Sequence, residues 1–142
     1  MLKRFTLAIL VASPFFFGAA AQQSPVKIPV NETPATSGKQ MFVSYCAPCH
    51  GVEGRGHGPA ASALKMPPTD LTMLSKNNQG KFPADHLTSV LRFGSEMPVH
   101  GSAEMPVWGP TLTRMDQNDN DHAKAELRIS NLKHYIETLQ MK

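Results

Sequence analysis

The chain has 142 residues, two cysteines and a formal net charge of +3 at pH 7. This length suits one domain with a modest core. Without Lys3 and Arg4, 12 of the 14 basic side chains remain against 11 acidic ones, a net charge of +1. So balanced a chain gives no global reason to expect binding to nucleic acid or to an anionic membrane.

Residues 1–21 are predicted to be a signal peptide. Lys3 and Arg4 form a basic start, residues 5–17 are mostly apolar and uncharged, and small residues ending at Ala21 provide a cleavage site. The alternative is a retained membrane anchor, but the apolar run is shorter than the roughly 20 residues of a spanning helix. We therefore expect a periplasmic protein that has no membrane span after cleavage.

Residues 22–36 are rich in proline, serine and threonine, which predicts a flexible tail without its own core. The ordered domain is predicted to span residues 37–142. Ser37 and Gln40 fit a capping box, and the helix that they begin runs toward Cys46. Its apolar side is formed by Met41, Phe42 and Tyr45.

The most specific motif lies at residues 46–50, where Cys46 and Cys49 are followed at once by His50. This is the attachment pattern of a c-type haem. Cysteines at this spacing lie on one side of a helical turn, so both sulfurs can reach the vinyl groups on one edge of a porphyrin. His50 can then be the proximal ligand of the iron. We expect one covalent haem c.

Two other sites could use the same residues. A redox dithiol also has two cysteines at this spacing, but it needs a strand–helix–strand context, and the chain shows no convincing strand. A structural zinc site usually has four ligands in two spaced pairs. Adjacent Cys49 and His50 would crowd its tetrahedral geometry.

Turns and one longer helix follow the motif. Residues 51–59 are glycine-rich and predict a loop, and short helical turns are expected at 59–64 and 70–74. A better helix has Pro83 at its first position and Gly94 as its C-cap.

Residues 95–110 contain an internal repeat and predict an extended loop. Glu-Met-Pro-Val occurs twice, so the loop carries two methionines in similar settings, Met97 and Met105, with His100 between them.

The end of the chain combines an acidic turn with a helix. Residues 116–121 resemble a calcium loop only weakly, because Asp121 and Leu127 replace the glycine and the bidentate glutamate. A last helix is predicted at 123–140. Its expected apolar face comprises Leu127, Leu132, Tyr135, Ile136 and Leu139, and its charged residues Lys124, Arg128, Lys133 and Glu137 lie elsewhere. The elements together predict an all-α domain.

The motifs YCAPCHG, GRGHGPAA, PPTDLT, HGSAEMPVWG and NLKHYIETLQ occur in this order. With them the chain resembles the soluble monohaem bacterial cytochromes c with histidine–methionine ligation, over residues 37–142. The resemblance implies a small cytochrome c fold, in which three to five helices wrap around one covalent haem. It also implies that the first and last helices cross, with Gly38, Phe42, Leu132 and Tyr135 at the contact.

The resemblance assigns further site residues. The carbonyl of Pro59 is expected to accept the Nδ1–H of the proximal histidine. Met105 lies in the MPVWG context and is expected to be the sixth ligand, with Met97 and His100 as the alternatives. Trp108 could donate to a haem propionate or simply cover the ring.

The implied function is electron transfer between redox proteins that dock transiently, without catalysis. A stable subunit of a dehydrogenase or a terminal oxidase is the alternative, while a peroxidase or gas sensor would need an open sixth position. Arg55 could pair with a propionate or lie solvated on the surface. Four histidines are expected at the surface or at helix ends and not as ligands, namely His57, His86, His122 and His134.

Overall fold

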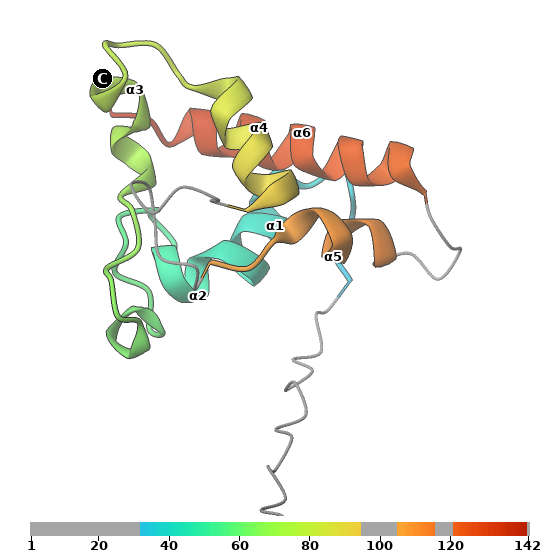
Figure 1. Ribbon diagram of the computed structural model, residues 1–142, viewed down its shortest axis with the longest axis horizontal. Coiled ribbons are helices and arrows are strands. Elements are labelled where there is room, and N and C mark those ends of the chain that lie inside the picture. Colours follow the sequence, from blue (N-terminus) through green and yellow to red (C-terminus); the bar gives the residue numbers. More distant parts are fainter. Residues whose placement is uncertain (1–31, 95–104, 116–120, 142) are drawn as a thin grey trace, which may run out of the picture.

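The computed structural model describes residues 32–94, 105–115 and 121–141. Within these ranges the chain forms helices and no β-strand, which confirms the predicted all-α class. The long helix α6 (His122–Thr138) runs across the molecule, and α1, α4 and α5 pack along it (Figure 1). None of the helices in the described ranges is long and apolar enough to cross a membrane.

The first helical segment runs without a break into the haem motif. It consists of α1 (Gly38–Met41), a π-helical turn η1 (Phe42–Cys46) and α2 (Ala47–His50). Ser37 is the N-cap, and its Oγ accepts a hydrogen bond from the Gln40 N–H at 3.3 Å, as the capping box predicts. The π turn widens the helix just before the motif, a distortion that is frequent at functional sites.

Short turns and α4 form the middle of the chain. The bounds are η2 (Ala61–Ala63), η3 (Leu71–Met73), α3 (Leu74–Asn77) and α4 (Ala84–Phe93). Pro83 is the N-cap of α4, so the helix begins one residue later than predicted. Gly94 ends the helix with a φ of 79°. Leu87 and Leu91, one turn apart, are buried, so this face of α4 packs on the core.

Helix α5 (Trp108–Arg114) was not expected, because the pattern predicted an extended loop up to Pro110. Pro110 is the third residue of this helix, where a backbone N–H has no intrahelical partner in any case. A side chain at Gly109 would overlap the carbonyl oxygen of Arg92. Leu112 is completely buried, so packing against α4 and the core stabilises the helix.

The first and last helices cross as predicted. A Cβ atom at Gly38 would overlap the carbonyl oxygen of Asn131, so only glycine allows this approach. The rings of Phe42 and Tyr135 lie next to each other, with centroids 5.3 Å apart and an interplanar angle of 54°. Leu132 is 1% exposed beside them.

The buried face of α6 differs from the predicted one: Ala125 and Ile129 also belong to it, and two adjacent residues exchange places. Leu127 is 43% exposed, whereas Arg128 is only 2% exposed. Arg128 is buried because its guanidinium donates a hydrogen bond of 2.6 Å to the carbonyl oxygen of Thr33. Asn131 donates similarly to Ala35 at 3.0 Å. Residues 33–35, which the composition assigned to the flexible tail, are thus fastened to α6.

Candidate haem site

Cys46 and Cys49 lie where the π turn passes into α2. Cys46 is 7% exposed, Cys49 is half-buried, and neither forms a disulfide. Burial, with a smaller contribution from Cys49, raises the pKa of the Cys46 thiol to about 12. A redox dithiol requires an accessible thiolate with a low pKa, so this environment disfavours that reading of the motif.

The imidazole of His50 is oriented by a backbone carbonyl. Its Nδ1 lies 2.9 Å from the carbonyl oxygen of Thr69, which can only accept a hydrogen bond. Burial lowers the pKa of His50, although the Thr69 carbonyl acts in the opposite direction. The neutral ring therefore carries its proton on Nδ1 and presents an unprotonated Nε2, the form in which histidine binds a metal.

The carbonyl that orients His50 was expected to come from Pro59, and the structure corrects this assignment to Thr69. The loop around Pro59 meets the motif through its N–H groups instead. Gly56 donates to the His50 carbonyl at 2.7 Å, and Gly58 donates to the Cys49 carbonyl at 2.9 Å. These bonds satisfy the last carbonyls of the motif helix, which have no partner within it.

Gly56 and Gly58 are required for this close approach. Gly56 has a φ of +84°, and a Cβ atom there would overlap the carbonyl oxygen of Pro68. A Cβ atom at Gly58 would overlap the carbonyl oxygen of Pro48. The glycine-rich segment therefore lets two loops lie against the haem motif.

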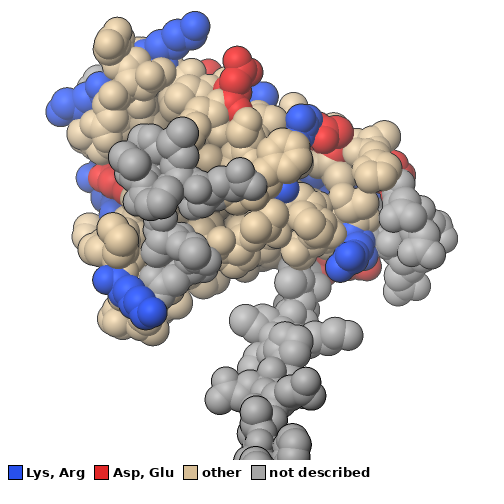
Figure 2. All heavy atoms as spheres, in the orientation of Figure 1, with Lys and Arg blue, Asp and Glu red and all other residues tan. Residues whose placement is uncertain are grey.

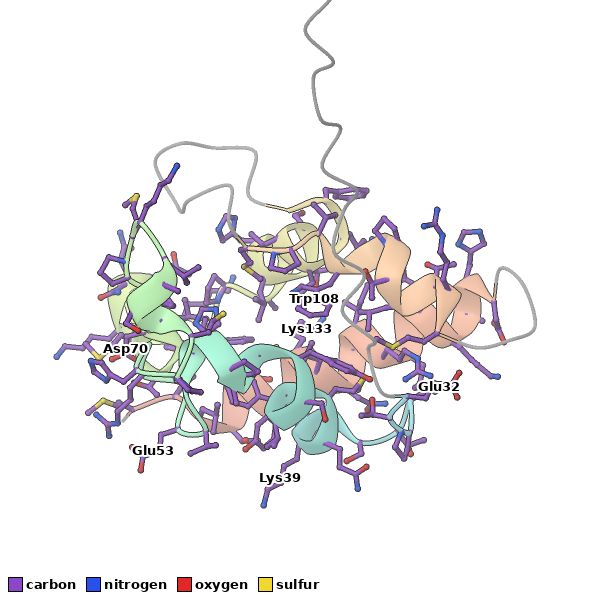
Figure 3. The ribbon with its side chains drawn as sticks, turned by 90° about the horizontal axis from the view of Figure 1, so that it is seen from below. Glu32, Lys39, Glu53, Asp70, Trp108 and Lys133 are labelled. Carbon is purple, nitrogen blue, oxygen red and sulfur yellow. The ribbon has the colours of Figure 1, made fainter. Side chains whose placement is uncertain are left out.

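Trp108 and Met105 come from the segment at the start of α5, and both pack against the core cluster. The Trp108 ring stacks on Tyr45, with centroids 5.6 Å apart and an interplanar angle of 29°. Figure 3 shows Trp108 toward the centre of the molecule. Met105 is half-buried and packs against the core cluster. Met97 and His100, the alternative ligands, lie outside the described residues.

The other candidate side chains are at the surface. Arg55 pairs with Glu53 at 3.3 Å, and both side chains are about half exposed or more. The four histidines expected outside the site are all exposed, namely His57, His86, His122 and His134. Asp116, Asn118 and Asn120 of the weak calcium motif lie outside the described residues.

The family of the cytochrome C oxidase, cbb3-type, subunit III matches residues 33–119, more than half of the chain. The chain belongs to this family of cytochrome c domains. No match was found among curated proteins or solved structures. The matched region begins at Thr33, the residue that Arg128 fastens to α6. A cytochrome c domain implies electron transfer through haem.

The residues of this cytochrome c domain fit a haem. Cys46 and Cys49 form the two-cysteine pattern beside His50, whose Nδ1 is already occupied by Thr69 and whose Nε2 is left for iron. The two cysteine sulfurs can attach a porphyrin covalently, and the oriented imidazole can bind its iron.

Proposed function

We propose that this protein is an exported electron carrier that holds one haem c covalently and is not itself an enzyme. The observation that carries the proposal is the His50 imidazole, whose Nδ1–H is taken by the Thr69 carbonyl beside Cys46 and Cys49. When bound, the haem supplies a one-electron Fe(II)/Fe(III) couple.

Each site residue has a separate role in this proposal. Cys46 and Cys49 form the thioether links to the porphyrin, and His50 binds the iron through Nε2. Met105 is the sixth ligand; its thioether favours Fe(II) and closes the position at which a substrate could bind. Trp108 packs on Tyr45, the residue directly before Cys46, and in this proposal it covers the haem ring.

Export and docking complete the proposal. The basic and apolar pattern of residues 1–21 supports cleavage after Ala21 and a periplasmic location. Most of the described surface visible in Figure 2 is uncharged, and lysine and arginine side chains lie mainly toward its edges. Such a surface suits the small, weak and transient contacts of electron-transfer proteins.

A second candidate is a stable subunit of an oxidase complex. The description of the matching family, subunit III of a cbb3-type oxidase, supports it. The two roles are separated by fractionating cells that express the native protein. A carrier is recovered in the periplasmic fraction, whereas a subunit is recovered with membranes and co-purifies with its oxidase.

The proposed site is tested by mass and optical spectroscopy of the exported protein. The mass should equal residues 22–142 plus one haem, and the haem should survive acid–acetone extraction. Cys46→Ala and Cys49→Ala should weaken this attachment, and His50→Ala should abolish the low-spin spectrum. Carbon monoxide should not bind the reduced protein if Met105 closes the sixth position. A bare-chain mass would refute haem attachment, and rapid carbon monoxide binding would favour a sensor or a peroxidase.

A further inference from the structure

The segment that orients His50 is itself fastened by Gln140, near the C-terminus. Gln140 Nε2 donates to the Leu71 carbonyl at 2.8 Å, and Gln140 Oε1 accepts from the Ser75 N–H at 2.8 Å. These contacts join residues 69 and 65 positions apart in the chain. Nε2 also donates to the Ile136 carbonyl at 3.0 Å, which ties the amide to α6. Because both ends of the amide are used, only one orientation of the side chain satisfies all three partners.

Further bonds transmit this constraint to the carbonyl that meets His50. The Asp70 carboxylate accepts hydrogen bonds from the N–H and the Oγ1 of Thr72, at 2.9 and 2.6 Å. The Leu71 N–H donates to the Gly54 carbonyl at 2.7 Å. Figure 3 shows Asp70 and Glu53, the neighbour of Gly54, at the same side of the molecule. Residues 70–72 are therefore held both to the loop after the motif and to the C-terminus, and Thr69 is the residue directly before them.

We propose that Gln140 is a positioning residue for the haem iron, which rests on the proposed function. By fixing residues 69–75, it sets the length and direction of the hydrogen bond between His50 Nδ1 and the Thr69 carbonyl. An acceptor on Nδ1 makes the imidazole a stronger donor to the metal. A stronger donor stabilises Fe(III) relative to Fe(II), so loss of the Gln140 contacts raises the reduction potential.

The alternative is that Gln140 merely ends α6. Its bond to Ile136 is of that kind, because Ile136 lies in the last turn of α6 and Gln140 follows the end of this helix. The bonds to Leu71 and Ser75 are not needed for that role. A matched control is Thr138, whose Oγ1 donates to the Tyr135 carbonyl at 2.6 Å in the same helical turn.

The test uses the haem-loaded protein and compares Gln140→Met, Gln140→Asn and Thr138→Val with the wild type. Methionine has a similar length but no amide, and asparagine keeps the amide on a shorter side chain, so neither can make all three bonds. Both variants are uncharged and leave the local charge unaltered. The reduction potential is measured together with the solvent exchange rate of the His50 Nδ1–H in protein that carries ¹⁵N-histidine.

Both Gln140 variants should shift the potential upward and accelerate exchange of the Nδ1–H, whereas Thr138→Val should change neither. The asparagine variant provides the result if the methionine variant does not fold. Unchanged potential and exchange in the Gln140 variants, or an equal shift in Thr138→Val, would overturn the inference. A wild-type protein without a covalent low-spin haem would instead refute the proposed function, so the two failures are distinct.

Discussion

The rings of Tyr45 and Trp108 stack with their centroids 5.6 Å apart. Tyr45 directly precedes the first cysteine of the motif, and its hydroxyl lies 2.8 Å from Thr33 Oγ1. Trp108 begins α5, three residues after Met105. The stack therefore joins the helix that carries the haem motif to the segment that carries the proposed sixth ligand.

This stack should have a measurable coupling energy. We expect a double-mutant cycle of Tyr45→Leu and Trp108→Leu to give about 0.5–1.5 kcal/mol of interaction beyond buried area. The measurement is chemical unfolding of the wild type, both single variants and the double variant. If the loss of stability in the double variant equals the sum of the losses in the two single variants to within about 0.3 kcal/mol, the rings are neighbours without an energetic coupling.

Replacing Met105 should open the iron. Met105→Ala removes the proposed thioether ligand, so the charge-transfer band of the oxidised protein should disappear and the potential should fall. The reduced protein should then bind carbon monoxide. Met97→Ala is the matched control because its methionine lies in the same Glu-Met-Pro-Val context, and it should keep the band. Loss of the band in Met97→Ala alone would assign the ligand to Met97.

A side chain at Gly38 should force α1 and α6 apart. The Cβ atom of Gly38→Ala would overlap the Asn131 carbonyl oxygen, and overpacking of this kind costs about 1–3 kcal/mol. The change is measured as the free energy of unfolding. Gly80→Asn is the control, since nothing lies within 4 Å of its Cβ position and asparagine tolerates a φ of +83° better than other side chains. An equally stable Gly38→Ala variant would contradict the observed crossing.

Arg128 should matter far more for stability than its neighbour Leu127. Arg128→Ala removes a hydrogen bond from a charged donor to the Thr33 carbonyl, which costs about 1.5–3 kcal/mol. Leu127→Ala changes an exposed side chain, so its effect should stay within about 0.5 kcal/mol. Thermal or denaturant unfolding compares the two. A larger loss of stability in Leu127→Ala than in Arg128→Ala would instead support the apolar pattern, which placed Leu127 on the buried face.

Local signals were sufficient for much of the fold. Ser37 caps the first helix and Gly94 ends α4 because a cap depends on side chains and φ angles within a few residues. The helix contact at Gly38 was implied by the family resemblance instead of by a local signal, and the structure confirms it. Helix α5 was missed because its short sequence has a proline and a glycine, and burial of Leu112 outweighs their low helix propensity.

The sequence by itself determined the chemistry of the site, since the attachment pattern of Cys46, Cys49 and His50 is contained in five adjacent residues. Only the tertiary structure decided that Thr69, and not Pro59, meets the His50 Nδ1. It also decided that Gln140 fastens residues 71 and 75, and that Arg128 is buried instead of Leu127. These contacts join atoms far apart in the chain, where a hydrogen bond depends on the packing of whole segments and no local periodicity encodes its partner.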